Sequence, residues 1–197
     1  KRTAIGGFGQ SLSSLPAIEI GSQLLKTVLD ETPQVKPYIE EVILGQVLTA
    51  GCGQNTARQT ALNAGLPINK SAFTINHVCG SGLKAVQLAA QLVLCGDAKM
   101  VGASGQESMS QAAHVLPNNR VSKKLGDLSL VDSLIKDGLW NSRENIHMGI
   151  TAENIAEKFA VTREEQDEFA VRSQQKAAHA ISCGSFKEEI SPIGIKN

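Results

Sequence analysis

One cysteine in this sequence stands where a thiol could act as a nucleophile. Cys79 lies between an apolar run that predicts a strand and a small-residue run that predicts a helix. The N–H groups and the dipole at a helix start stabilise a thiolate, which is the nucleophilic form of cysteine. Gly80 and Gly82 let the backbone turn sharply and let a substrate approach closely. The same turn aims backbone N–H groups at the group under attack, which predicts an oxyanion hole.

Two other interpretations of this segment stay open at the level of the residues. Most free cysteines are small buried hydrophobic residues with no catalytic role. Gly80, Gly82 and Ala85 also match the dinucleotide-binding pattern G-x-G-x-x-A. That pattern expects an acidic residue about 20 positions later. Asp97 follows Gly82 by 97 − 82 = 15 positions, which disfavours dinucleotide binding relative to the nucleophile.

The elements around Cys79 alternate between strand-like and helix-like segments. This alternation predicts an α/β fold with a mostly parallel sheet. Beyond residue 106 the pattern changes to a long polar stretch followed by two helices, the second opened by the capping-box spacing of Thr162 and Glu165. The predicted strands span 41–48, 73–78 and a segment from 100, and the predicted helices span 16–31, 55–63, 81–95, 152–160 and 162–183.

Composition and charge exclude several classes of protein. The chain has 197 residues, of which 42% are hydrophobic, and its 19 basic and 19 acidic residues cancel. This is globular composition, enough for one large domain or two small ones. The neutral charge balance gives no reason to expect binding to nucleic acid or to an anionic membrane. The most apolar stretch, Ala85–Ala103, is interrupted by polar residues, so we expect no membrane span there.

The four cysteines show neither a metal-binding pattern nor a disulfide framework. They are scattered without C-x-x-C spacing, so we expect no metal site. Reduced cysteines are typical of a cytosolic compartment, and we expect a cytoplasmic protein. The four are Cys52, Cys79, Cys95 and Cys183.

Six segments, in order along nearly the whole chain, resemble motifs of the thiolase family. The segment Val78–Ala85, read as VCGSGLKA, resembles the nucleophile motif of these enzymes. The other five are GQNTARQ at 53–59, GQESMS at 105–110, KDGL at 136–139, HMGITAEN at 147–154, and the helical pair EEQDEFA at 164–170 with SQQKA at 173–177.

The resemblance implies acyl transfer on coenzyme A thioesters, with Cys79 as the residue that becomes acylated. In the biosynthetic direction, two acetyl-CoA molecules would give acetoacetyl-CoA and CoA. The resemblance implies no cofactor beyond the CoA thioester substrates, and it implies a homo-oligomer, either a dimer or a tetramer. A degradative 3-ketoacyl-CoA thiolase and a non-catalytic, thiolase-derived acyl-CoA-binding half are the alternatives.

Three further residues are implicated in substrate binding by the same resemblance. Leu139 resembles a residue that packs on the adenine end of CoA. His147 and Met148 match the HMGxTAEN motif of the short-chain, biosynthetic thiolases and would line a small acyl pocket. Without the motif, each of these residues would be interpreted as ordinary packing or hydrogen bonding.

The resemblance also implies that this chain is the N-terminal half of a longer enzyme. Residues 1–108 would form the N-terminal thiolase α/β half that carries the nucleophile, and residues 109–197 the first part of the CoA-binding loop domain. The family's catalytic histidine, its second cysteine and the asparagine that positions a water would lie outside this chain. A half-fold of this kind would expose an apolar face that the other half covers.

Overall fold

The computed structural model describes residues 1–120 and 125–195, so part of the predicted loop domain lies outside the described residues. The chain divides into two compact units. The sheet unit comprises Thr3–Gly138 and Ser191–Asn197, and the hairpin unit comprises Lys1–Arg2 and Leu139–Ile190. The predicted boundary after residue 108 stays a prediction.

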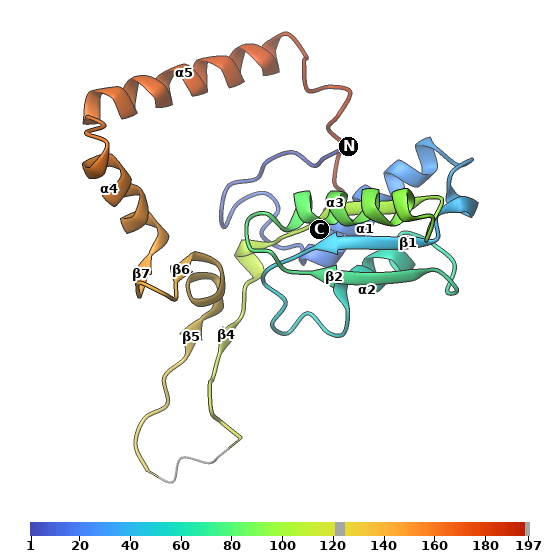
Figure 1. Cartoon of the computed structure of the whole chain (residues 1–197), viewed down its shortest axis with the longest axis horizontal. Helices are drawn as coiled ribbons and strands as arrows, with labels where there is room; N and C mark the ends of the chain where they lie inside the picture. The colour runs from blue at the N-terminus through green and yellow to red at the C-terminus, as the bar shows by residue number, and fades with distance from the viewer. Residues whose placement is uncertain (121–124, 196–197) are drawn as a thin grey trace. The chain divides into compact units, whose positions relative to one another are not determined.

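The elements follow one another as drawn in Figure 1. Short helical turns lie at Lys36–Tyr38, Met109–Gln111 and Leu134–Leu139. The sheet unit contains α1 (Ala17–Glu31), β1 (Glu41–Gly45), α2 (Thr56–Asn63), β2 (Ser71–Ile75), α3 (Ser81–Cys95), β3 (Val101–Gly105), β4 (His114–Val115) and β5 (Val131–Asp132). The hairpin unit contains β6 (Trp140–Asn141), β7 (Ile146–His147), α4 (Met148–Lys158) and α5 (Arg163–Ser182).

The main sheet is parallel, as the sequence predicts, with strand order β2-β1-β3. In the register, Ile43 lies opposite Phe73 on one side and Ala103 on the other. The central run Val42, Ile43 and Leu44 is at most 1% exposed. Such a continuous apolar run is typical of a parallel strand covered on both faces.

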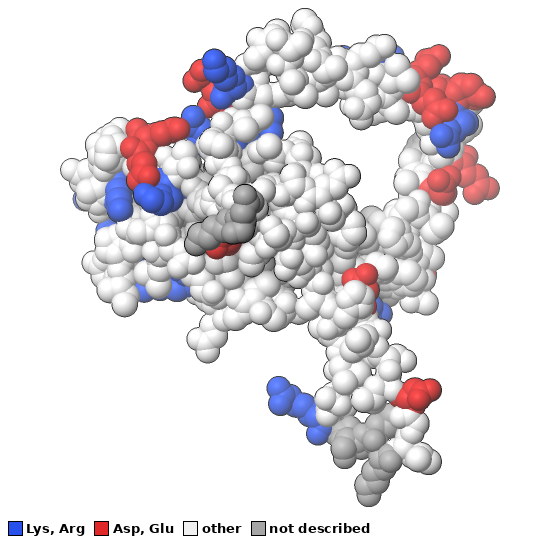
Figure 2. Space-filling view, turned by 180° about the vertical axis from the view of Figure 1, so that it is seen from behind, with Lys and Arg blue, Asp and Glu red and all other residues white. Residues whose placement is uncertain are grey.

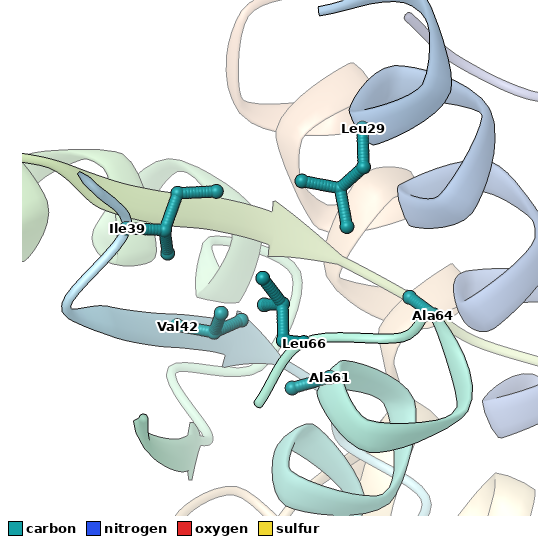
Figure 3. Close-up of a cluster of buried hydrophobic side chains, with 6 residues drawn as sticks. All are labelled: Leu29, Ile39, Val42, Ala61, Ala64 and Leu66. Atoms are coloured by element: carbon teal, nitrogen blue, oxygen red, sulfur yellow. The ribbon is translucent and has the colours of Figure 1, made fainter. Parts of the chain in front are cut away.

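Helices cover both faces of this sheet. Successive strand side chains point to opposite faces, so Val42 and Ile43 enter different cores. Ile43 packs with Ala85 and Ala89 of α3 on one face. The core on the other face joins α1 and α2 to β1, as Figure 3 shows. Its buried members are Leu29, Ile39, Val42, Ala61, Ala64 and Leu66.

The window Val78–Cys95, which includes α3, is long and apolar enough to cross a membrane by length and composition alone. The expectation for Ala85–Ala103 rested in part on Asp97 and Lys99, and both lie beyond this window. A membrane span is surrounded by lipid or by other spans, whereas Ala85 is fully buried against a parallel sheet. We therefore interpret α3 as a layer of the α/β fold.

Three predicted elements differ from the structure by more than one residue at an end. β1 ends at Gly45 because the N–H groups of Val47 and Leu48 bond to the Glu107 carboxylate instead of to a strand. β2 ends at Ile75, before the predicted residue 78, because the next residues form a turn. α4 begins four residues earlier than predicted, because His147 caps it.

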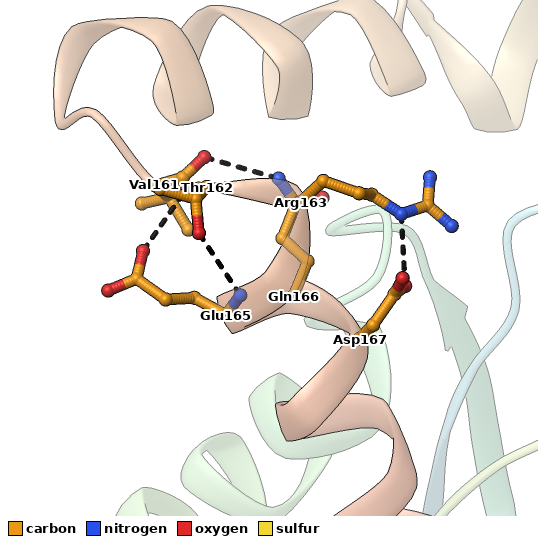
Figure 4. A network of polar contacts seen from close by, with 6 residues as sticks. All are labelled: Val161, Thr162, Arg163, Glu165, Gln166 and Asp167. Carbon is orange, nitrogen blue, oxygen red and sulfur yellow. Dashed lines mark hydrogen bonds and ion pairs between the residues drawn. The ribbon is translucent and has the colours of Figure 1, made fainter.

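The hairpin unit consists of the β6–β7 ladder and the two helices that follow it. The predicted capping box of α5 is present: Thr162 Oγ1 accepts from Glu165 N–H at 3.2 Å, and the Glu165 carboxylate accepts from Thr162 N–H at 2.8 Å (Figure 4). On the face drawn in Figure 2, basic and acidic side chains are interspersed, and acidic ones gather near the beginning of α5.

Candidate active site

Cys79 lies on a tight turn that joins the end of β2 to the start of α3. The residue before it, Val78, has a φ of 48°, in the left-handed region. A β-branched residue rarely adopts this conformation, which costs about 1–3 kcal/mol and persists only where neighbouring groups enforce it. Such strained residues cluster at active sites. The Cys79 side chain is exposed.

Side-chain hydrogen bonds from both ends of the turn hold Val78 in place. The Asn76 Oδ1 atom accepts the Val78 N–H at 2.9 Å. The Ser81 hydroxyl donates to the Val78 carbonyl at 2.6 Å and accepts the His77 N–H at 2.8 Å. Both peptide groups of Val78 are therefore fixed by side chains.

The start of α3 lies directly on the carboxyl ends of β1 and β3. A Cβ atom added to Gly45 would lie 2.5 Å from the Ser81 carbonyl carbon, and one added to Gly105 would lie 3.3 Å from the Gly82 Cα. Only residues without a side chain leave this space. The two strand-end glycines thus fix how close the nucleophile turn lies to the sheet.

Several backbone donors at this turn have no partner among the described residues. The N–H groups of Cys79, Gly82 and Leu83 make no hydrogen bond there, whereas Ser81 N–H bonds the Val78 carbonyl. Unused N–H groups at the start of a fifteen-residue helix carry its positive partial charge. An exposed thiol with such donors beside it can attack a carbonyl carbon and offer hydrogen bonds to the resulting oxyanion.

A buried polar network lies just beyond the carboxyl ends of β1 and β3, and the sequence did not predict it. Gln106 follows β3; it donates to Gln46 Oε1 at 2.9 Å and accepts from the Thr60 hydroxyl at 2.8 Å. Glu107, the next residue, accepts the Val47 and Leu48 N–H groups at 2.9 and 3.2 Å. Burial raises the pKa of Glu107, and these two backbone hydrogen bonds oppose that shift. Its partners are about 60 positions away, so no local pattern marks the contact.

The other three cysteines lie in different settings from Cys79. None forms a disulfide: Cys52 is half-buried, and Cys95 and Cys183 are exposed at the ends of α3 and α5. A hydrogen bond with the Ser185 side chain, 3.1 Å away, lowers the pKa of the Cys183 thiol, and the Ser185 backbone adds to this shift. Among the described residues, no three His, Cys, Asp or Glu side chains gather as metal ligands.

The three predicted substrate-binding residues lie together in the hairpin unit, whereas Cys79 belongs to the sheet unit. Leu139 directly precedes β6, and Met148 directly follows β7. Because Trp140 pairs with His147, Leu139 and Met148 flank the same end of this ladder. His147 caps α4 by accepting the Gly149 N–H at its Nδ1 atom, 3.0 Å away. That bond requires a lone pair on Nδ1 and leaves Nε2 as the donor of the neutral ring.

The fold and the turn define an α/β protein with an exposed cysteine just before the start of a helix. The family model "Thiolase, N-terminal domain" matches residues 1–197. The chain therefore belongs to the thiolase family. This membership favours the nucleophile interpretation of Gly80, Gly82 and Ala85 over dinucleotide binding, and the thiolase-type fold is confirmed.

Known proteins agree with this assignment over half of their length. An acetyl-CoA acetyltransferase of Thiocystis violacea is 59% identical over 98% of this chain and 49% of its own length. A probable acetyl-CoA acetyltransferase of Escherichia coli K12 is 52% identical, with the same coverage. The crystal structure of the Acat5 thiolase from Ascaris suum in complex with coenzyme A has a TM-score of 0.91 at 39% identity, and covers 96% of this chain and 49% of that one. The chain thus spans about half the length of the curated relatives it matches.

Proposed function

We propose that this chain supplies the acyl-accepting nucleophile of an acetyl-CoA acetyltransferase that condenses two acetyl-CoA molecules to acetoacetyl-CoA and CoA. The observation that carries the proposal is the exposed Cys79 on a strained turn, beside unused backbone N–H groups. The relatives named acetyl-CoA acetyltransferase support the choice of reaction.

In the first step, the Cys79 thiolate attacks the carbonyl carbon of acetyl-CoA. A C–S bond to Cys79 forms, and the C–S bond to coenzyme A breaks. The CoA thiolate leaves and takes up a proton. The N–H group of Cys79 is free to donate to the oxyanion of the tetrahedral intermediate. This covalent route divides one difficult transfer into two easier steps.

In the second step, another acetyl-CoA loses a proton from its Cα to a base. The resulting carbanion attacks the carbonyl carbon of acetyl-Cys79, forming the new C–C bond. The C–S bond to Cys79 then breaks, which releases acetoacetyl-CoA and restores the thiolate. We propose that the base belongs to the remaining half of the enzyme, because this chain covers 49% of its relatives. The substrates are CoA thioesters, and no further cofactor takes part.

We assign Leu139, His147 and Met148 to substrate binding, with Leu139 toward the adenine end of CoA and the other two toward the acyl group. Their common position at one end of the β6–β7 ladder supports this grouping. The His147 ring, held by the Gly149 N–H, offers its Nε2 atom as a donor. We further propose a cytoplasmic homo-oligomer.

Acyl transfer to Cys79 is tested by intact-mass spectrometry of the full-length protein that carries this chain, after incubation with acetyl-CoA. We expect one acetyl group, which peptide mapping places on Cys79. Cys79→Ala removes the nucleophile and therefore the adduct, whereas the matched variant Cys95→Ala keeps it. An acetyl group on any other cysteine, or none on correctly folded protein, would refute the proposal.

A series of acyl-CoA substrates separates the proposed enzyme from a degradative 3-ketoacyl-CoA thiolase. We expect acetyl and acetoacetyl thioesters to react and longer chains to react poorly, because His147 and Met148 would leave little room. Efficient cleavage of long-chain 3-ketoacyl-CoA would assign the degradative activity instead. Binding of CoA without any acyl transfer would identify a non-catalytic acyl-CoA-binding protein.

A further inference from the structure

The backbone conformation at Val78 needs an explanation that the proposed chemistry does not give. A φ of 48° is unfavourable for valine, yet Val78 adopts it directly before the nucleophile. Val78 is 47% exposed, so close packing of its side chain does not enforce this geometry. Local hydrogen bonds are the remaining source of support.

Asn76 supplies the bond that reaches the Val78 amide. Its Oδ1 atom accepts the Val78 N–H two residues ahead, at 2.9 Å, which is the Asx-turn arrangement by which asparagine stabilises tight turns. The Asn76 amide nitrogen has no hydrogen bond among the described residues, so this one contact accounts for the side chain's position. Asn76 is itself exposed, which argues against a role in core packing.

The second support, Ser81, belongs to the helix side of the turn. Its side chain is buried against Gly45, and its hydroxyl holds the Val78 carbonyl. Ser81 therefore anchors the far peptide of Val78 to the sheet. The near peptide is held at both of its polar atoms: the Val78 N–H donates to Asn76 Oδ1, and the His77 carbonyl accepts the Gly80 N–H at 3.1 Å. Asn76 is the only side chain among the described residues that bonds this peptide.

We propose that Asn76 is a positioning residue for Cys79: by accepting the Val78 N–H, it keeps Val78 left-handed and so keeps the thiol at the start of α3. This inference rests on Cys79 being the nucleophile of the proposed function. Asn76 acts through Val78 and needs no contact with the substrate.

The test is a double-mutant cycle read out by alkylation. Rates of iodoacetamide modification at Cys79 are measured by peptide mapping in the full-length protein, with Cys95 of the same molecules as the reference. Cys183 is a poor reference because its pKa is lowered. We expect Asn76→Ala to slow the alkylation of Cys79 roughly tenfold relative to that of Cys95. This factor corresponds to the free energy of one unfavourable backbone conformation that has lost its support.

A second substitution, Val78→Gly, tests whether Asn76 acts by supporting the backbone conformation of Val78. Glycine adopts a positive φ without support, so Val78→Gly should restore most of the Cys79 rate in the Asn76→Ala background. Asn76→Ser keeps a weaker side-chain acceptor and should give an intermediate rate. The matched control, Asn55→Ala, removes a side chain that caps α2 by accepting the Arg58 N–H, and should leave the ratio of the two rates unchanged.

Several outcomes would overturn the proposal. An unchanged rate in Asn76→Ala would show that Val78 needs no such support. A slowed rate that Val78→Gly does not restore would show that Asn76 acts in another way. If Val78→Gly alone slows the alkylation of Cys79, the Asn76→Ser variant provides the test instead. An alkylation rate in Asn76→Ser that is no higher than the rate in Asn76→Ala would then reject the proposal. Alkylation does not require acetyl-CoA, so failure of the proposed function is scored separately by the acetylation experiment.

Discussion

Glu107 is a half-buried carboxylate whose ionisation is linked to the stability of the sheet unit. Burial raises its pKa above the ordinary value of 4.5, although the Val47 and Leu48 N–H groups oppose the shift. As the pH rises, the unfolded chain therefore releases this proton before the folded chain does. The contribution of Glu107 to the free energy of unfolding then falls, from pH 4.5 up through the raised pKa.

We expect Glu107→Gln to remove this pH dependence. The stability of the wild type relative to the glutamine variant should be highest below pH 4.5 and should decrease toward neutral pH. Urea unfolding of both proteins between pH 4 and pH 7 measures the difference (about four conditions suffice). Glu157→Gln, on the α4 surface, should show no such trend. A stability difference that stays constant or grows with pH would contradict the assignment.

At the scale of single residues, the sequence predicted a candidate nucleophile but not the contacts that hold its turn. Cys79 was found because a strand pattern, glycines and a helix pattern are adjacent along the chain. The left-handed conformation of Val78 could not be predicted, because a β-branched residue on its own favours a negative φ. The contacts of Glu107 with the loop after β1 depend on tertiary folding, which brings together residues about 60 positions apart.

At the scale of elements, the capping box of α5 is the feature most open to local test. Thr162→Ala removes the acceptor of the Glu165 N–H and should destabilise the first turn by about 1 kcal/mol. Hydrogen exchange should therefore quicken at the first amides of α5. Ser173→Ala, in the middle of the same helix, should not quicken it, because alanine favours helix. Equal exchange in both variants would show that the cap does not determine the stability of this helix end.

Element prediction succeeded where signals are local and failed where tertiary contacts decide. The range of α3 was predicted to the residue, because Gly80 and Gly96 bound an unbroken helix pattern. β1 was predicted three residues too long, because Val47 and Leu48 look like strand but bond to Glu107. The long polar stretch beyond residue 106 contains the short strands β4, β5 and β6, each two residues long and without a periodic pattern to reveal it.

At the scale of the whole molecule, one face of α3 is unusually apolar for a protein surface. The exposed side of α3 carries Leu83, Val86, Val93 and Leu94, which are 78%, 52%, 46% and 85% exposed. Contiguous exposed apolar patches mark surfaces that other structure covers. The chain spans about half the length of its relatives, so the rest of the enzyme is the occupant we expect on this face.

Cysteine labelling in the full-length protein tests this expectation directly. A thiol at position 86 should be shielded, so Val86→Cys should react with a maleimide roughly tenfold more slowly than Asp30→Cys, at the exposed end of α1. Peptide mapping separates both from the natural cysteines. Both rates are measured in the full-length protein, so the test does not depend on whether this chain folds alone. Equal rates would mean that α3 keeps an open apolar surface in the complete enzyme, and that the face serves a separate partner.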